Sequence, residues 1–463
     1  MRTPPPTPAP PRGSQRKRRK PAPGSRQGPL SSSQSSASVV LARHYLSQRP
    51  LRVTCQNGRI ASIEQLAEAT PTDHWIAPGL LDLQINGYAG VDFQAEVVSL
   101  DALLTAARGL RRAGCTRFLA TLVTDAWERM LDKLGRLRAL RNRSPELTAA
   151  IAGWHIEGPF LSEQPGYCGA HDPGCMCDPL PERIRQLRAA AGNDLLLLTL
   201  APERRGAIEA IALAISLGIR ISLGHTNASA ERISEAIEAG ASGFTHLGNG
   251  CPQTLDRHDN ILWRVLESSG LTVSMIPDGR HVSPPLFRLA HRLLPSGALV
   301  YITDAMAAAG APPGRYALGK MQLEVGDDQV VRMPGQPYYA GSALRPLDGV
   351  WRAAAMTRTP WPRAWWRFSQ RPAQWLGLPT GLAVGQRADF CLLKQTGNEM
   401  PSRVRVFCGG EEAGPILSRC ARSSREIRRI EASSHGAPAR PRDGTGRRRQ
   451  VWFDDGGPRR SGR

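Results

Sequence analysis

The sequence contains no run of eighteen or more apolar residues, which is the approximate length that a helix needs to cross a bilayer. Residues 1–43 contain no Asp or Glu, and they also lack the apolar core of a secretory signal. Cysteine occurs nine times without a regular spacing, so no disulfide framework is indicated. We therefore expect no transmembrane helix and no membrane association, and we expect a cytoplasmic protein with reduced thiols.

Positive charge is concentrated at the two ends of the chain. Residues 1–43 hold nine Arg or Lys, and residues 411–463 hold thirteen Arg against seven acids, so the ends carry +15 of the net charge of +20. Both ends are rich in Pro, Ser, Gly or Arg, and such segments bury too little apolar surface to offset the entropy of ordering. We predict disordered tails over residues 1–38 and 411–463, with nucleic-acid contact expected only if these basic tails provide it.

The middle of the chain repeats a strand-like apolar run followed by a helix-like stretch. Residues 229–240, for example, predict a helix that begins after Ser229 and stops at Gly240. Continuously apolar short strands indicate burial on both faces, as in a parallel sheet. There are eight such runs: LLDLQING (80–87), TRFLATLVT (116–124), AAIAGWHIEG (149–158), DLLLLTLAPE (194–203), IRISLGHT (219–226), GFTHLGNG (243–250), LTVSMIPDG (271–279) and ALVYITDAM (298–306).

Eight strand–helix units over about 250 residues predict the α/β class and a (β/α)8 barrel of the TIM type, here over residues 78–382. An open, doubly wound sheet is the alternative. The flanking residues 39–77 and 383–410 contain further strand-like runs, and the dipeptide Asn57-Gly58 is a hairpin signal. We predict that these two flanks pair into one small β-sandwich built from both ends of the folded region.

Four polar residues each follow one of the apolar runs: Glu157, His225, His246 and Asp304. The carboxyl ends of barrel strands meet at one mouth, whereas an open sheet would scatter these residues along an edge. Two imidazoles and a carboxylate can hold one divalent cation. A further carboxylate can take a proton from a water molecule whose pKa the cation lowers. The sequence therefore predicts metal-assisted hydrolysis, with zinc, iron, cobalt and manganese all suited to such a donor set.

Seven sequence blocks occur in an order typical of a known family. Between about residues 50 and 410 the chain resembles the N-acetylglucosamine-6-phosphate deacetylases of the amidohydrolase superfamily. The blocks are PGLLDLQINGYAGVDF, WHIEGPFLS with GAHDP, GHTNAS, THLGNGCP, DGRHV, TDAMAAAG and AGSAL.

The resemblance implies hydrolysis of the acetamide of N-acetylglucosamine 6-phosphate to glucosamine 6-phosphate and acetate, in amino-sugar catabolism. It implies that Glu157, His225 and His246 hold one divalent metal ion per subunit, with Asp304 as catalytic acid and base. It also implies that His171 contacts the substrate near the scissile acetamide. Arg257 and His281 would bind the sugar phosphate, in the family partly across a homodimer interface. The complete set of implied substrate-binding residues is Ala170, His171, Asn249, Gly250, Arg257, Asp278, His281, Tyr339, Ala340 and Gly341.

Many amidohydrolases carry His-x-His at the end of the first barrel strand, where it binds a second metal. Here Gln84 and Asn86 occupy that place, and neither amide supplies an imidazole or a full negative charge. We therefore expect a single metal, with the two amides supporting the site by holding a water molecule. A different amidohydrolase, acting on another N-acyl or cyclic amide, is one alternative, and it commonly needs His-x-His. A catalytically inactive binding protein is the other.

Two departures from the family pattern stand out. Arg257 is followed by His-Asp-Asn where many members have a Pro-Gly turn, and Arg371 replaces the usual Asn before Pro-Ala. Two further clusters each have a functional and a plainer interpretation. Cys168, Cys175 and Cys177 suggest either a zinc knuckle or free loop thiols, with the thiols favoured because no fourth ligand has the motif spacing. The aromatic residues of 361–368 favour a packed helix over a sugar platform.

Overall fold

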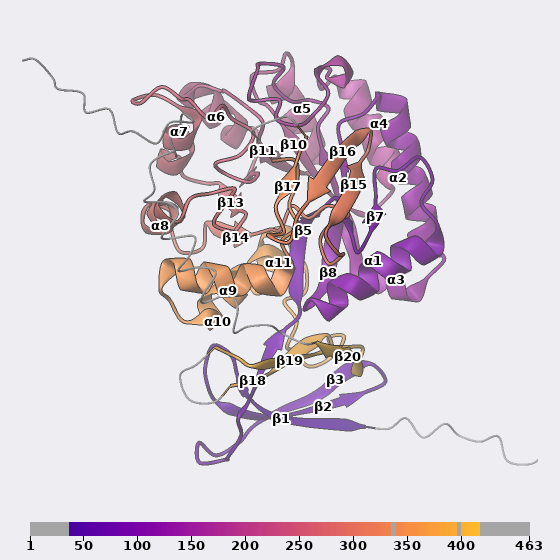
Figure 1. Cartoon of the computed structure of the whole chain (residues 1–463), viewed down its shortest axis with the longest axis vertical. Coiled ribbons are helices and arrows are strands. Elements are labelled where there is room, and N and C mark those ends of the chain that lie inside the picture. The colour runs from indigo at the N-terminus through magenta and orange to yellow at the C-terminus, as the bar shows by residue number, and fades with distance from the viewer. Residues whose placement is uncertain (1–36, 335–338, 396–399, 417–463) are drawn as a thin grey trace, which may run out of the picture. The chain divides into compact units, whose positions relative to one another are not determined.

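The computed structural model describes residues 37–334, 339–395 and 400–416. Its centre is a sheet of eight parallel strands, and each of them falls within or beside one of the predicted apolar runs (Figure 1). The strands follow one another in chain order around the sheet, which is the topology of a (β/α)8 barrel. They are β5 (Leu80–Ile85), β8 (Cys115–Val123), β9 (Ile151–Glu157), β10 (Leu195–Leu200), β11 (Arg220–Leu223), β12 (Gly243–Phe244), β13 (Thr272–Met275) and β14 (Leu299–Tyr301).

The barrel closes where the last strand returns to the first. Ala305, just beyond β14, forms a parallel bridge with Ile85 of β5 and accepts a hydrogen bond of 2.7 Å from the backbone N–H of Asn86. Below this point the buried carboxylate of Asp82 accepts a 2.7 Å hydrogen bond from the Thr303 hydroxyl. Burial raises the pKa of Asp82 to about 7. The open-sheet alternative is thus wrong, and the closure brings the end of the first strand beside Asp304.

Helices surround the barrel, and the capping signals in the sequence place their ends. Ser99 and Ser229 accept hydrogen bonds from backbone N–H groups at the starts of α1 (Leu100–Arg112) and α6 (Ala230–Glu238). The chain leaves α6 through Gly240 at a φ of 110°, as the stop signal predicts. The other helices are α2 (Trp127–Asn142), α3 (Pro145–Ala150), α4 (Pro181–Ala191), α5 (Ala207–Ser216), α7 (Ile261–Glu267), α8 (Pro284–Leu293), α9 (Pro346–Thr357), α10 (Trp361–Arg367) and α11 (Gln370–Leu376), with a short 3-10 turn at Pro173–Cys175.

The aromatic run 361–368 covers α10 and its C-terminal cap, Phe368, and the side chains of Trp361, Trp365 and Phe368 are buried. The packed-helix interpretation is confirmed. Among the described residues, no helix combines the length and apolar character needed to cross a bilayer.

A second sheet combines strands from both ends of the folded region, as predicted for the flanking β-sandwich. Its seven strands are hydrogen-bonded in the order β20 (Glu411–Ile416), β19 (Arg403–Cys408), β18 (Phe390–Lys394), β4 (His74–Pro78), β1 (Ser38–His44), β2 (Pro50–Gln56) and β3 (Arg59–Gln65). Asn57 and Gly58 both have positive φ, 51° and 72°, in the turn between β2 and β3, as the hairpin signal predicts. The sheet curls so that Ile60 exchanges backbone hydrogen bonds with residues 385–386, and a shared apolar core fills the space inside.

The structure corrects the expected edges of this region. The tail predicted from residue 411 onward begins too early, because β20 covers Glu411–Ile416 and pairs antiparallel with β19. The strand was not predicted because it is an edge strand that begins with two glutamates, which is not the apolar pattern of a buried strand. In the structure, Glu412 forms a 2.6 Å ion pair with Arg405. The strand β1 likewise begins one residue inside the expected first tail. The rest of both predicted tails, residues 1–36 and 417–463, lies outside the described residues.

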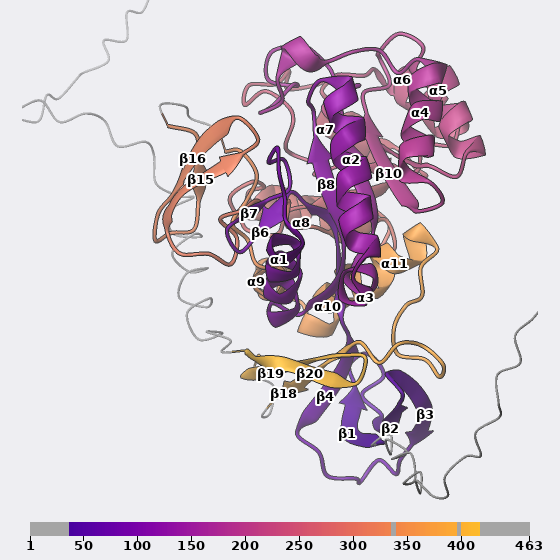
Figure 2. The ribbon, with the colours of Figure 1, turned by 90° about the vertical axis from the view of Figure 1, so that its right-hand side faces the viewer.

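The segment between β14 and α9 holds a small sheet that the sequence did not indicate. It consists of β15 (Gly314–Leu318), β16 (Met321–Val325) and β17 (Val331–Arg332), all antiparallel. Figure 2 shows β15 and β16 near the short pair β6 (Gly87–Tyr88) and β7 (Val91–Asp92), and Gly319 donates a 2.8 Å hydrogen bond to Asp92. This contact places the turn between β15 and β16 over the carboxyl ends of the barrel strands.

Candidate active site

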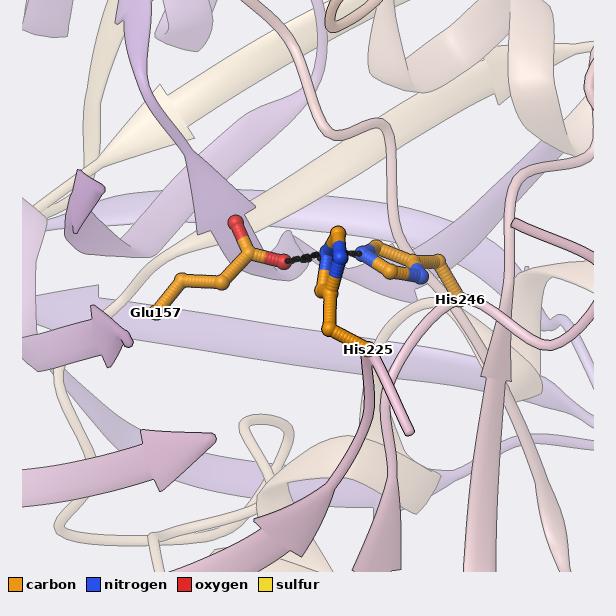
Figure 3. A group of neighbouring side chains, drawn as sticks. All are labelled: Glu157, His225 and His246. Atoms are coloured by element: carbon orange, nitrogen blue, oxygen red, sulfur yellow. Dashed lines mark hydrogen bonds and ion pairs between the residues drawn. The ribbon is translucent and has the colours of Figure 1, made fainter. Parts of the chain in front are cut away.

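Three predicted ligands converge at the mouth of the barrel. Glu157 ends β9, while His225 and His246 follow β11 and β12. Figure 3 shows the three side chains pointing toward one another. The carboxylate Oε1 of Glu157 lies 2.8 Å from Nε2 of His246 and 3.4 Å from Nε2 of His225, and the two imidazole nitrogens are 3.2 Å apart. All three side chains are buried. Within the described residues, this is the one group of three acidic, histidine or cysteine side chains whose donor atoms lie within 4.8 Å of one another.

Backbone conformation aims the functional side chains. His225, His246 and Asp304 have positive φ values of 51°, 35° and 53°. L-residues with a side chain seldom adopt this left-handed conformation, which costs on the order of 1–3 kcal/mol per residue. Each of these residues comes just after a barrel strand, where the unusual turn lets the chain leave the strand while the side chain stays at the barrel mouth.

The donor set fits a divalent cation. Bonds of about 2.0–2.2 Å in a tetrahedral arrangement put neighbouring donor atoms roughly 3.3–3.6 Å apart, close to the spacings found here. The Tyr167 carbonyl oxygen lies 2.9 Å from Nδ1 of His225, so the ring proton sits on Nδ1 and the Nε2 lone pair faces the other donors. Burial acts to raise the pKa of Glu157, but the adjacent imidazoles of His225 and His246 outweigh it and hold that pKa well below its usual value. The carboxylate is therefore ionised, as a metal ligand must be.

Two glycines make room for the His225 ring. A Cβ atom on Gly169 would lie 2.9 Å from Cε1 of the ring, and one on Gly250 would lie 2.9 Å from Nδ1. Both distances are shorter than real Cβ contacts allow. The loops that carry these residues, one near His171 and one after His246, thus fix the position of the imidazole.

Asp304 lies beside the candidate metal ligands and is held by the two first-strand amides. Its Oδ1 accepts hydrogen bonds of 3.0 Å from Gln84 and 2.7 Å from Asn86. The same Gln84 nitrogen lies 3.0 Å from Oε2 of Glu157, so one amide links the two carboxylates. Burial and the negative charge of Glu157 raise the pKa of Asp304 to about 6. A carboxylate with this pKa can take and return a proton near neutral pH.

His171 approaches the same point from the loop after β9. Its Nδ1 lies 2.8 Å from the Thr124 hydroxyl, and its Nε2 lies 3.9 Å from the Glu157 carboxylate. Its ring meets that of His225 edge to face, with centroids 4.5 Å apart. Burial, with a smaller contribution from the neighbouring His225 ring, lowers the pKa of His171 to about 3, so the ring is neutral. A neutral imidazole held in this way offers a hydrogen bond to a substrate oxygen.

A pocket of about 1130 Å³ opens over these side chains. The structure brings most of the predicted residues to its wall: Asn86, Glu157, Ala170, His171, His225, His246, Asn249, Gly250, His281, Asp304, Tyr339, Ala340 and Gly341. Their proposed roles toward substrate stay predictions.

Three predicted residues lie elsewhere. Gln84 is in the layer beneath the pocket wall, where it bonds to the carboxylates. Asp278 is buried behind His281, with Oδ2 2.7 Å from the Nδ1 of that ring, so it orients His281 and does not itself line the pocket. Arg257 is exposed and outside the pocket lining of its own chain.

The pocket wall also includes basic residues that sequence reasoning missed, namely Lys133, Arg280 and Lys320. Arg280 lies inside the block DGRHV, next to His281, and this position beside a predicted substrate-binding residue could have identified it. Lys320 lies on the turn between β15 and β16, which the sequence did not indicate. The thiols of Cys168, Cys175 and Cys177 are free, and the metal-binding group found within the described residues does not include them.

Comparisons with known proteins give the chain's relatives. No family model matches the chain. An N-acetylglucosamine-6-phosphate deacetylase from Vibrio furnissii is 33% identical over 344 residues, which cover 72% of this chain and 84% of that protein. The Homo sapiens protein of the same name is 34% identical over 331 residues, covering 69% of this chain and 79% of the relative.

Solved structures of N-acetylglucosamine-6-phosphate deacetylases are similar to most of the chain. A single-site mutant of the enzyme from Mycobacterium smegmatis, in complex with N-acetyl-D-glucosamine-6-phosphate, has a TM-score of 0.72 at 31% identity and covers 82% of this chain and 99% of its own. The enzyme from Thermotoga maritima has a TM-score of 0.71 at 25% identity, covering 82% of this chain and 100% of its own.

Proposed function

The chain belongs to the N-acetylglucosamine-6-phosphate deacetylase family, and we propose that it hydrolyses the acetamide of N-acetylglucosamine 6-phosphate to acetate and glucosamine 6-phosphate. The observation that carries the proposal is the meeting of Glu157, His225 and His246 beside Asp304 at the barrel mouth. These are a hydrolytic donor set and a proton carrier in one pocket.

The proposed roles follow from the contacts of each side chain. A divalent cation, when bound by Glu157, His225 and His246, would polarise the amide carbonyl and lower the pKa of a water molecule. Asp304 takes a proton from the attacking water and returns it to the amine nitrogen as the C–N bond breaks. Both amide hydrogen bonds to Asp304 go to Oδ1, which leaves Oδ2 as the proton acceptor.

His171 has a separate task in the proposed mechanism. The Thr124 hydroxyl occupies its Nδ1, so Nε2 is the atom available to the substrate. A hydrogen bond from Nε2 to the carbonyl oxygen stabilises the negative charge that develops there as water adds. Asp278 fixes the neighbouring His281 through its Nδ1, which positions that ring at the pocket wall.

We further propose one divalent ion per subunit, drawn from zinc, iron, cobalt or manganese, in a homodimer located in the cytoplasm. The single-metal proposal rests on Gln84 and Asn86, whose amides donate to carboxylates where a second metal would need ligands.

Acetate release from N-acetylglucosamine 6-phosphate tests the proposal, with other N-acetylhexosamines, cyclic amides and N-acyl amino acids as comparison substrates. Metal analysis of the same sample should give one equivalent. An enzyme that hydrolyses only cyclic amides, or binds two equivalents, would support the alternative amidohydrolase. A protein that binds no metal and turns over none of these substrates would be an inactive binding protein.

A further inference from the structure

A rigid turn after β13 presents two neighbouring side chains to the pocket. The Oδ1 atom of Asp278 accepts hydrogen bonds of 2.8 Å from the backbone N–H of Arg280 and 2.9 Å from that of His281. Its Oδ2 atom holds the His281 ring at 2.7 Å. Arg280 and His281 both line the pocket, and one buried carboxylate therefore fixes the backbone from which both extend.

The guanidinium of Arg280 has unused hydrogen-bonding capacity. Its Nε atom is buried and has no hydrogen-bond partner among residues 37–334, 339–395 and 400–416. A buried donor without a partner is unfavourable, because it has lost its hydrogen bonds to water. A ligand that accepts a hydrogen bond from Nε would remove this cost when it binds.

The charge of Arg280 is also not neutralised by a direct ion pair within the described residues. Its charge acts on the pKa of Asp328, in the turn before β17. The pKa of Asp328 is lowered mainly by its hydrogen bond from Arg332, and the charge of Arg280 contributes less. Asp328 itself pairs with Arg332 at 2.6 Å, so among the described residues the Arg280 guanidinium is left without a carboxylate partner.

The other two basic residues of the pocket wall differ from Arg280, because one is paired with an acid and the other lies on a different segment. Lys133 forms a 2.9 Å ion pair with Asp125. Lys320 lies on the turn between β15 and β16, where its charge acts on the pKa of Cys175 in the loop after β9. Neither is next to His281 in the chain, whereas Arg280 is.

We propose that Arg280 binds the phosphate of the substrate and so sets the preference of this chain for a phosphorylated amino sugar. The inference rests on the proposed function and adds a residue to it. A guanidinium matches a phosphate because its planar N–H donors reach two oxygens at once. With Arg257 exposed and outside the pocket lining, Arg280 is, in the part of the chain that the structure describes, the guanidinium at the pocket wall.

The test compares Arg280→Ala and Arg280→Lys with the parent enzyme on N-acetylglucosamine 6-phosphate and on N-acetylglucosamine. We expect Arg280→Ala to lower the ratio of kcat/KM for the two substrates by about tenfold or more, mainly through a higher KM for the phosphorylated sugar. Activity toward the unphosphorylated sugar should be kept, which shows that the variant folds. Arg280→Lys should recover part of the ratio, because it restores the charge without the planar donors.

Lys320→Ala is the matched control, since it removes a positive charge from the same pocket wall. A ratio in Arg280→Ala that falls less than about tenfold, or that falls equally in Lys320→Ala, would overturn the proposal. Calorimetry with glucosamine 6-phosphate and glucosamine measures the phosphate contribution without turnover. A parent enzyme that hydrolyses neither acetylated sugar refutes the proposed function, while loss of the binding difference in Arg280→Ala tests the role of Arg280 separately.

Discussion

Replacing Asp304 with asparagine tests the proton-transfer step with little change in shape. In the wild type, Oδ1 of Asp304 accepts hydrogen bonds from Gln84 and Asn86. The oxygen of an asparagine can accept both of these bonds, so the side chain should keep its place. The second carboxylate oxygen becomes an NH2 group, which cannot accept a proton. Asp304→Asn therefore removes the base and leaves the ligand set intact.

The size of the effect follows from what the carboxylate contributes. Positioned proton transfer is worth about 10²–10⁴ in rate, so kcat should fall by a factor in that range. Bound metal should stay at the parent level, because Asp304 is not among the three converging donors. Acetate release at saturating substrate gives the rate, and elemental analysis of the same sample gives the metal content.

Asp82→Asn is a matched control, since it makes the same chemical change in the same strand closure. Asp82 is buried below the pocket, bonded to Thr303, and its pKa of about 7 means that the charge is already partly lost at neutral pH. We expect this variant to keep kcat within about tenfold of the parent. Parent-like turnover by Asp304→Asn, or an equal loss in both variants, would refute the assignment of Asp304 as the base.

Four further predictions address the metal, the loops and stability. His246→Ala should lose the bound metal, and full occupancy by elemental analysis would contradict the ligand set. Gly250→Ala should weaken metal affinity roughly 10–100-fold by displacing a ligand imidazole, whereas Gly206→Ala, which has a similar φ of 75° and open space, should not. Burial lowers the pKa of His291 to about 4 in the folded state, so its contribution to stability is present above pH 6.5 and is lost as the pH falls toward 4. His291→Gln should remove this pH dependence, which amounts to up to about 3 kcal/mol in the free energy of unfolding measured with urea. Deleting residues 1–36 should leave turnover unchanged, and an inactive but folded truncation would show that these residues contribute to activity.

The barrel could be predicted from the sequence because buried parallel strands are apolar on both faces. The prediction holds even for β12, which is only Gly243–Phe244, because the neighbouring turn residues mark the strand end. The small sheet of 314–332 could not be predicted in the same way, since its strands are short and several of its residues are exposed. The polar edge strand β20 was missed for a related reason, because it pairs with one neighbour only.

The sequence predicted those site residues that directly follow an apolar strand. Glu157, His225, His246 and Asp304 each stand at such a position, and the structure brings them together. Contacts within the site were less accessible to sequence reasoning. Gln84 and Asn86 were expected to hold a water molecule, and that stays a prediction, while their direct bonds to carboxylates depend on how β14 meets β5. Asp82 was overlooked because an acid inside an apolar run gives no signal of its partner.

The left-handed backbone at His225, His246 and Asp304 implies a conflict between thermal stability and catalytic activity. Glycine adopts this conformation without a steric penalty, so substituting it at any of the three positions should relieve local tension even as it silences the enzyme. A laboratory selection for thermal stability alone would therefore favour variants that are more stable but inactive. Any attempt to stabilise this protein has to measure turnover together with the melting temperature.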